Sequence, residues 1–300
     1  MLAPGKGKTQ KAYLWAYASA RSEPLKAVVY DFAPSRSGEH ARAFLGHDPE
    51  RRERGQPPWT GHLVCDDYSG YKELFGHGVT EVGCMAHARR KFFELHAANK
   101  SAIAGTALEL IGELYDIERD IRDLDAVARL EQRRSRAAPV AKTLHEWMLA
   151  HRHKVPPGSA TAKALDYSLK RWTALTRYID DARLPPDNNH DEQQIRPWAT
   201  GRKNWLFAGT LAAGQRAAVI TSLIQSAKLN GHDPYVYLKD VLERLPTQRA
   251  SDIGGWRQLS CPAVLPQLKM LPVCLTGFAP APRSWRPRRS GDEQPAAASP

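Results

Sequence analysis

The stretch from Leu184 to Gly209, LPPDNNHDEQQIRPWATGRKNWLFAG, gathers acidic, amide, basic and aromatic side chains in one short segment. A Pro-Pro pair ends whatever precedes it, and the Asp-Asn-Asn that follows provides good N-caps for a new helix. Asp191 and Glu192 then fall in or near the first turn, where the helix dipole favours negative charge. Glu192 and Arg196 lie four residues apart and share a helix face. Pro197 should kink or end that helix.

A basic and aromatic run, Gly201 to Trp205, follows this helix. Arg202 and Lys203 suit a phosphate backbone, and Trp205 could stack on an unpaired base. On spacing alone two interpretations stay open. The segment is either a site that binds nucleic acid or a capped surface helix with one ion pair and a solvated basic loop.

A second acidic position follows an apolar strand. Residues 62–65 read as a strand that ends in Asp66 and Asp67, and residues 80–85 form the next strand before a basic amphipathic helix over 87–98. This strand–helix–strand–helix order predicts parallel pairing in an α/β core, where functional groups gather beyond the carboxyl ends of the strands. Either aspartate could be the functional acid, and a strand-end aspartate could also simply cap the short helix expected over 68–75.

The composition favours a polyanionic partner. Forty-three Lys and Arg against 32 Asp and Glu give a formal charge of +11, and nucleic acid is the simplest partner for such a chain. No apolar run approaches the roughly 20 residues of a membrane span, and the start lacks the apolar core of a signal peptide. We therefore expect a cytoplasmic protein with no membrane partner.

The four cysteines do not form a C-x-x-C pair, which argues against a zinc ribbon. Cys65 and Cys84 lie in apolar, strand-like runs and read as buried thiols. A metal cluster of Cys65, Cys84 and His87 is conceivable on these spacings, but it is the weaker interpretation.

The rest of the sequence predicts the strands and helices that would position the acidic and basic residues named above. Alternating residues over 13–18 and an apolar run over 27–32 predict a β-hairpin, and a short helix follows at 37–45. Helical spacing over 100–183 predicts a block of three or so helices, and further helices are expected over 216–229 and from Pro234 to about Leu245. Beyond Gln248 the periodicity disappears, and the Pro- and Arg-rich tail is expected to be mostly disordered.

Four segments in register resemble the transposases of the IS66 family: LVCDDYSGYKEL (63–74), CMAHARRKFFEL (84–95), DNNHDEQQIRPWATGRKNWLFAG (187–209) and NGHDPYVYLKDVLERLP (230–246). The resemblance covers roughly residues 3 to 246 and implies an α/β, RNase H-like catalytic core of the DDE type. Residues 1–99 would form its first part, 100–183 an all-helical insertion, 184–248 its second part, and 249–300 the disordered tail.

The resemblance also implies the chemistry. Transposases of this type cut and transfer DNA strands with divalent metal ions, Mg²⁺ or Mn²⁺, held by two aspartates and one glutamate. Matching the motifs assigns Asp66 and Glu192 as catalytic and metal-binding residues. Transposon ends and target DNA would be the partners, with a second copy or an intact transposase as a further partner. The expected DNA contacts are His87, Arg89, Arg90, Arg196, Arg202, Lys203 and Trp205.

The chain departs from the family pattern at its beginning. The family's first catalytic aspartate lies on a strand just before a segment like residues 2–9, so we expect an N-terminally truncated transposase with weak or no nuclease activity. The alternative is a non-catalytic DNA-binding or assembly remnant. Since RNase H-like sheets have the strand order 3-2-1-4-5, the hairpin and the parallel pair should flank a vacant central position.

Overall fold

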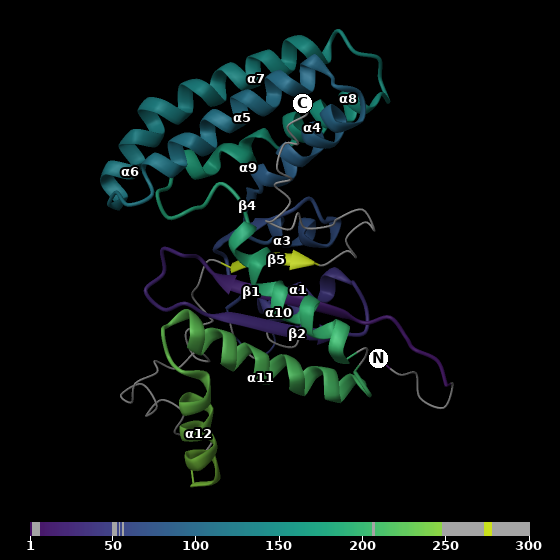
Figure 1. Cartoon of the computed structure of the whole chain (residues 1–300), viewed down its shortest axis with the longest axis vertical. Helices are drawn as coiled ribbons and strands as arrows, with labels where there is room; N and C mark the ends of the chain where they lie inside the picture. The colour runs from purple at the N-terminus through teal and green to yellow at the C-terminus, as the bar shows by residue number, and fades with distance from the viewer. Residues whose placement is uncertain are drawn as a thin grey trace, which may run out of the picture.

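In the computed structural model of the chain, residues 1, 7–49, 53, 55, 57–205, 208–247 and 273–277 are described, and only the backbone is described for 202, 203, 205, 245 and 273–277. The fold is mixed α/β and mostly helical. A five-stranded sheet lies between a bundle of helices, drawn above it in Figure 1, and two further helices below it.

The first two strands form the expected hairpin. β1 (Tyr13–Ser19) pairs antiparallel with β2 (Val28–Ala33), with Tyr13 opposite Ala33. Side chains alternate along a strand, so Trp15 and Tyr17 pack on one face of the sheet while Ala16 and Ala18 pack on the other. Both faces of β1 are therefore buried.

The predicted parallel pair is also present. β3 (His62–Cys65) pairs with β4 (Thr80–Gly83), and the connection contains a 3-10 turn, η1 (Ser69–Tyr71), and a short helix, α3 (Lys72–Phe75). Parallel strands need such a crossover, because the chain must return to the same end of the sheet.

The hairpin and the parallel pair do not pair with each other. Between them lies β5 (Val273–Gly277), antiparallel to β1 and parallel to β3, which gives the order β2-β1-β5-β3-β4. The central position is thus flanked as expected, but the expectation that it is vacant is wrong, because a segment from near the end of the chain fills it. For the rest of the tail beyond residue 247, disorder stays a prediction outside the described residues.

Helices cover both faces of the sheet. On the Trp15 face, α1 (Gly38–Phe44) and α3 pack on β1 and β3 through residues such as Ala41 and Leu74. On the other face, α10 (Asn189–Trp205) and α11 (Leu211–Leu229) pack on β1 and β2 through Ile195 and Ala218. The closest approach is at Gly214, where an added Cβ would lie 2.3 Å from the ring of Phe32.

The helical block has its own core, which continues onto Val64 and Val82 of the sheet. Its side-chain caps follow the rule that a polar residue accepts the first free backbone N–H groups, as Ser101 and Asp125 do. α12 (Pro234–Arg244) and η4 (Leu245–Thr247) follow α11. The block over 100–183 consists of α5 (Ala102–Asp120), α6 (Ala126–Gln132), the short π-helix η2 (Arg133–Ala137), α7 (Ala138–Arg152), α8 (Ala160–Lys170), α9 (Trp172–Thr176) and η3 (Arg177–Ile179). The preceding helix, α4 (Met85–Asn99), packs against it and shares its core.

Pro197 does not end α10. The helix continues to Trp205, so the basic run at its end is helical and not a loop. Proline removes one backbone donor, which leaves the carbonyl of Gln193 without its helical partner, and Gln193 is exposed so that water can reach it. None of the helices in the described part of the chain is both long enough and apolar enough to cross a membrane.

Candidate functional site

Asp66 lies directly beyond the carboxyl end of β3, in a turn that its own side chain closes. Its Oδ1 accepts the backbone N–H of Tyr68 at 3.1 Å, an interaction that favours a sharp turn after the strand. Burial raises the pKa of Asp66, while this hydrogen bond and the positive charges of Arg36 and Arg171 oppose the rise. The carboxylate is therefore held in a fixed and partly desolvated position.

Arg171 fixes the backbone at the same place. It is 8 % exposed, donates Nη2 to the carbonyl of Asp66 at 3.3 Å, and pairs with Glu81 at 2.5 Å. Burial opposes the charge of Arg171, but Tyr167 and Glu81 raise its pKa, so it stays charged. The helical block thus reaches across to hold the end of β3, and the sequence analysis missed this pair. In the sequence, Arg171 and Glu81 are visible only as one basic and one acidic residue within segments whose apolar positions define a helix and a strand.

The two neighbouring aspartates have different surroundings. Asp67 is 40 % exposed and lies 3.7 Å from both the exposed Lys72 and the buried Arg171. The Asp66 carboxylate points into the turn and is the more buried of the two. Of the two acids left open by the spacing, the geometry favours Asp66.

Glu192 faces α4. Its Oε1 lies 3.5 Å from Nε2 of His87, and its Oε2 lies 4.0 Å from Arg90. Burial raises the pKa of Glu192, Arg90 opposes the rise, and the negative charges of Asp66 and Asp187 add to it. Asp66 and Glu192 are 126 positions apart in sequence, yet they are close enough for the charge on one to affect the other. Because a two-metal site is only roughly 4 Å across, we expect the two carboxylates to lie within about 8 Å of each other.

His87 is packed against this glutamate. Its side chain is 19 % exposed, and its Nδ1 is buried without a hydrogen-bond partner among the described residues. Burial, with help from Arg90, Arg171 and Lys91, lowers the pKa of His87 to about 4. The imidazole is therefore neutral at neutral pH and acts as a polar neighbour of Glu192. The prediction that His87 contacts DNA remains untested.

The segment before α10 is docked by its backbone. The N–H of Met85 donates to the carbonyl of Pro186 at 2.9 Å, and Tyr115 donates its hydroxyl to Asp187 at 2.7 Å. Asp187 in turn accepts the backbone N–H of Asn189 at 3.0 Å, which places a carboxylate at the start of the helix as expected. These contacts bring Glu192 beside α4. Tyr115 was not singled out from the sequence, where it reads as part of the apolar stripe.

The predicted DNA contacts lie on two helices. Arg89 and Arg90 are exposed on α4, and Arg196 is exposed on α10. No ion pair joins Glu192 and Arg196 among the described contacts, since the partners of Glu192 come from α4. The side chains of Arg202, Lys203 and Trp205 lie outside the described part of the structure.

The two described thiols are free and buried. Burial raises the pKa of Cys65 and raises that of Cys84 to about 12, so neither is poised to become a thiolate ligand. Among the described residues no three His, Cys, Asp or Glu side chains are grouped to hold a metal ion. The conceivable cluster of Cys65, Cys84 and His87 therefore does not form.

The sequence matches known families over most of its length. The model of the transposase IS66 family matches residues 1–216, and that of the IS66 C-terminal element matches residues 222–254. The uncharacterized protein y4jD of Sinorhizobium fredii is 38 % identical over 256 residues, which cover 81 % of this chain and 48 % of that protein. The uncharacterized protein y4qI of the same organism is 34 % identical over 279 residues, covering 88 % of this chain and 48 % of that protein.

This chain spans about half the length of these curated relatives. No solved structure matches it. Because the family model covers well over half of the residues, and the relatives share more than 30 % identity along most of the chain, the family is established. The chain belongs to the IS66 family of transposases.

Proposed function

We propose that this chain carries the catalytic region of a DDE-type transposase, in which Asp66 and Glu192 take part in metal-dependent cutting and joining of DNA strands. The observation that carries the proposal is the placement of Asp66 directly beyond the carboxyl end of β3 and of Glu192 in the first turns of α10, near enough that the charge of Asp66 adds to the raised pKa of Glu192. Family membership supports a role in transposition.

The donor chemistry of the pair fits a divalent cation. Mg²⁺ and Mn²⁺ prefer carboxylate oxygens, and both carboxylates have a raised pKa mainly because they are partly buried; the negative charge of Asp66 adds to the rise in the pKa of Glu192. A cation between them would relieve that repulsion. Asp66 and Glu192 would hold it, and when bound it would supply activation of the attacking group and stabilisation of the leaving oxygen.

The chain's own residues would orient the reaction. The turn around Tyr68 and the contact from Arg171 fix Asp66, while His87 and Arg90 fix Glu192. The exposed Arg89 and Arg196 would hold phosphates of the DNA backbone near the two acids. Their charges are distributed over two helices that meet at the site.

The sheet supports an RNase H-like core. The strand order β2-β1-β5-β3-β4 matches 3-2-1-4-5 when β5 takes the central place. The polarity agrees as well, since β5 is antiparallel to the hairpin strand beside it and parallel to β3. In such a sheet Asp66 lies at the carboxyl end of the strand next to the central one.

Metal binding tests this proposal directly. We expect Mn²⁺ titrations, followed by electron paramagnetic resonance, to show binding that Asp66→Asn and Glu192→Gln each weaken by at least about tenfold, because each removes an anionic ligand. Asp67→Asn is the matched control, since it removes the same charge one residue away from an exposed side chain. Equal binding by all four proteins would overturn the assignment.

Cleavage of element-end DNA is the second measurement. Only two carboxylates in the described part of the chain are assigned to the metal, so we expect residues 1–300 alone to cut weakly, and a metal misplaced by about 1 Å costs on the order of 100-fold in rate. Whatever cleavage is seen should vanish in Glu192→Gln and persist in Asp67→Asn. Robust cleavage that survives Glu192→Gln would contradict the proposed mechanism.

The second candidate function is DNA binding or assembly with an intact transposase, without catalysis. The finding that favours it is that, among the described residues, no three His, Cys, Asp or Glu side chains are grouped to hold a metal ion. Salt-sensitive DNA binding together with an absence of specific Mn²⁺ binding would select this alternative.

A further inference from the structure

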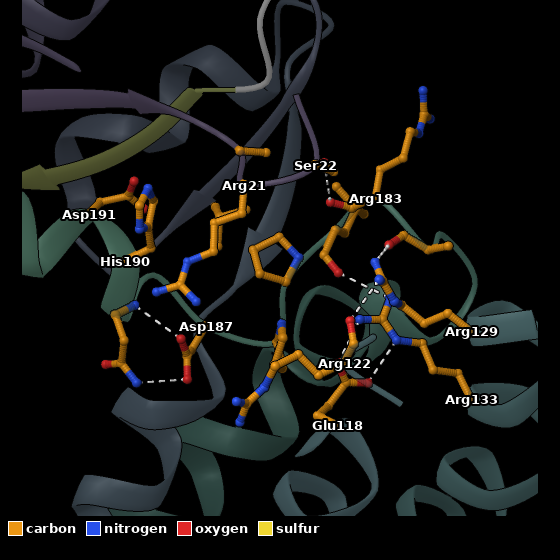
Figure 2. Close-up of a pocket in the computed structure, with 17 residues that line it drawn as sticks. Arg21, Ser22, Glu118, Arg122, Arg129, Arg133, Arg183, Asp187, His190 and Asp191 are labelled. Atoms are coloured by element: carbon orange, nitrogen blue, oxygen red, sulfur yellow. Dashed lines mark hydrogen bonds and ion pairs between the residues drawn. The ribbon is translucent and has the colours of Figure 1, made fainter. Parts of the chain in front are cut away.

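A cavity of about 550 Å³ opens between the helical block and the sheet, beside the start of α10. Its walls come from the turn between β1 and β2, from α5, α6 and η2, and from the segment that leads into α10, as Figure 2 shows. The cavity is therefore built from parts of the chain that lie far apart in sequence. Of its lining residues, Asp187 also positions α10 and with it the candidate site.

Arginine is the most frequent residue in the lining of the cavity. Two of these arginines are neutralised: Arg133 pairs with Glu118 at 2.7 Å, and Arg183 pairs with Asp181 at 2.7 Å. The other three have no carboxylate partner among the described residues. The five arginines of the lining are Arg21, Arg122, Arg129, Arg133 and Arg183.

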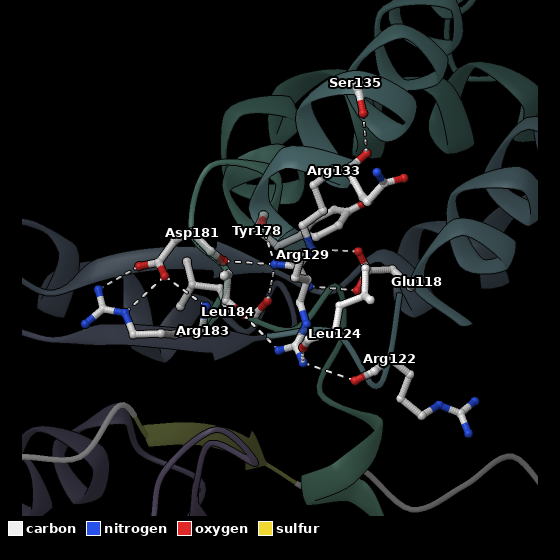
Figure 3. A network of polar contacts seen from close by, with 12 residues as sticks. Glu118, Arg122, Leu124, Arg129, Arg133, Ser135, Tyr178, Asp181, Arg183 and Leu184 are labelled. Carbon is white, nitrogen blue, oxygen red and sulfur yellow. Dashed lines mark hydrogen bonds and ion pairs between the residues drawn. The ribbon is translucent and has the colours of Figure 1, made fainter. Parts of the chain in front are cut away.

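Arg129 is held in place by neutral groups. Its guanidinium donates to the carbonyl oxygens of Leu124 at 2.8 Å, Arg122 at 3.1 Å and Ala182 at 3.4 Å (Figure 3). Carbonyl groups fix the geometry without cancelling the charge. These bonds use three of the five guanidinium N–H groups, which leaves donors for an anion and little side-chain entropy to lose when one binds.

Arg133 makes the wall rigid. It is 2 % exposed and donates to both carboxylate oxygens of Glu118 and to the carbonyls of Tyr178, Asp181 and Leu184 at 2.7 to 3.1 Å (Figure 3). One buried side chain thus ties α5 and η2 to the segment that carries Arg183. The cavity does not depend on mobile side chains for its shape.

The acids of the lining are engaged or buried. Asp187 accepts hydrogen bonds from Tyr115 and Asn189, and Asp191 is 2 % exposed. Arg21 and Arg122, in contrast, are exposed. Charge that can reach a ligand is therefore positive.

We propose that this cavity binds phosphate groups of a DNA backbone through Arg21, Arg122 and Arg129. Guanidinium groups match phosphate geometry with paired N–H donors, and three of them without a carboxylate partner among the described residues line this cavity. Asp191 lines the cavity while the next residue, Glu192, faces α4, so the two features lie on different faces of α10. DNA bound in this cavity would therefore contact the protein outside the proposed cleavage site. The inference rests on the proposed DNA function and adds a second contact region to it.

The test compares two double variants of the full chain. Arg21→Gln with Arg122→Gln removes two exposed charges from the cavity, and Lys142→Gln with Lys163→Gln removes two exposed charges from α7 and α8. Affinity for a fluorescent duplex is measured by anisotropy over a range of salt, in EDTA. We expect the cavity variant to bind at least about tenfold more weakly, with a salt slope smaller by about 0.9 for each phosphate that is no longer neutralised, and the control to change less than about threefold. Equal effects in both variants, or none in the cavity variant, would overturn the proposal.

Hydrogen exchange locates the binding surface. DNA should slow amide exchange over residues 119–131 and 181–191, whereas inorganic phosphate at millimolar concentration should not. Equal protection by phosphate alone would mean a small-anion site and would overturn the DNA assignment. The DNA-binding measurement is made in EDTA and so does not depend on divalent metal. Loss of DNA binding in the cavity variant with intact cleavage, or intact DNA binding with loss of Mn²⁺ binding and cleavage, would therefore tell the two proposals apart.

Discussion

Asp66 and Asp67 differ by one position and not at all in chemistry, and their surroundings decide their roles. The Asp66 carboxylate closes its own turn and is desolvated, while Asp67 is 40 % exposed among basic side chains. A carboxylate can bind a cation tightly only if it is held in place and partly shielded from water. Burial and a backbone hydrogen bond provide both conditions for Asp66.

The contact between His87 and Glu192 leads to a prediction about positioning. His87→Ala should remove the nearest polar neighbour of the Glu192 carboxylate and free it to rotate. Groups that orient a metal ligand typically contribute roughly 10- to 100-fold to metal affinity, so we expect Mn²⁺ affinity to fall by about tenfold. Arg89→Ala, on the same helix and exposed, is the control and should leave the affinity unchanged. An unchanged affinity in His87→Ala would show that Arg90 alone holds the glutamate.

Asp31 on β2 offers a test of pH dependence. Burial raises the pKa of this carboxyl above its ordinary value, although the nearby His40 opposes the rise. A raised pKa in the folded state means that ionisation costs stability, and this cost grows as pH rises through the interval between the unfolded and folded pKa values. Asp31→Asn should therefore be more stable than wild type at neutral pH, and the difference should vanish at a pH below the unfolded pKa of about 3.9. Urea denaturation at both pH values measures it, and a difference that grows toward low pH would contradict the sign.

The acids of the proposed site were predicted from the family motifs, but the residues that hold Asp66 in place could not be. Asp66 and Glu192 belong to motifs with fixed neighbours, whereas Arg171 and Glu81 meet across 90 positions. A pairing over that distance is set by how the helical block docks on the sheet. Local patterns contain no information about such docking.

At the scale of elements, periodicity located most strands and helices to within a few residues. Of the two effects expected of Pro197, a kink or an end of the helix, the structure excludes the end. Proline disfavours the interior of a helix because it removes one backbone hydrogen bond and its ring clashes with the preceding turn. Here Ile195 packs on the sheet and the surrounding turns stay helical on both sides. Tertiary packing outweighs the local preference, and the sequence alone cannot report the strength of that packing.

The contact between α1 and η1 predicts a steric effect on the site. An added Cβ at Gly38 would lie 2.3 Å from the carbonyl oxygen of Gly70, and backbone cannot move aside as a side chain can. Gly38→Ala should cost about 1 to 3 kcal/mol and displace the turn that follows Asp66. Gly112→Ala on α5 is the matched control, since nothing lies within 4 Å of its added Cβ and alanine favours a helix by about 1 kcal/mol. Thermal denaturation should shift in opposite directions, and a stabilised Gly38→Ala would show that the close contact yields.

The π-helix η2 begins with two adjacent arginines that have different surroundings. Arg133 points into the protein and satisfies Glu118 and three carbonyl groups, while the side chain of Arg134 is 61 % exposed. Arg133→Ala leaves a carboxylate uncompensated in a poorly solvated place and should cost about 3 to 5 kcal/mol. Arg134→Ala should cost less than about 1 kcal/mol, as for a surface ion pair. Chemical denaturation of both variants measures this, and similar losses would mean that Glu118 becomes solvated when Arg133 is removed.

At the scale of the whole molecule, the central strand is the feature that sequence analysis missed. The order of the other four strands followed from the resemblance, and so did the position between them. A five-residue apolar segment in a tail without periodicity gives no sign that it joins a sheet across the length of the chain. Strand pairing at such separation depends on which edges the rest of the fold leaves open. Here the open edges are those of β1 and β3.

The last prediction follows from those edges. Without β5, the inner edges of β1 and β3 would both expose unpaired backbone groups, and such edges recruit strands from other molecules. We expect a chain of residues 1–247 to lose at least about 3 kcal/mol, at roughly 1 kcal/mol for each backbone hydrogen bond, which lowers Tm by roughly 6 to 12 °C. It should also form oligomers in size-exclusion chromatography with light scattering. A chain of residues 1–280 keeps β5 and is the control, so it should behave like the full chain. If residues 1–247 stay monomeric with an unchanged Tm, β5 does not stabilise the sheet, and β1 and β3 are held together by their covering helices alone.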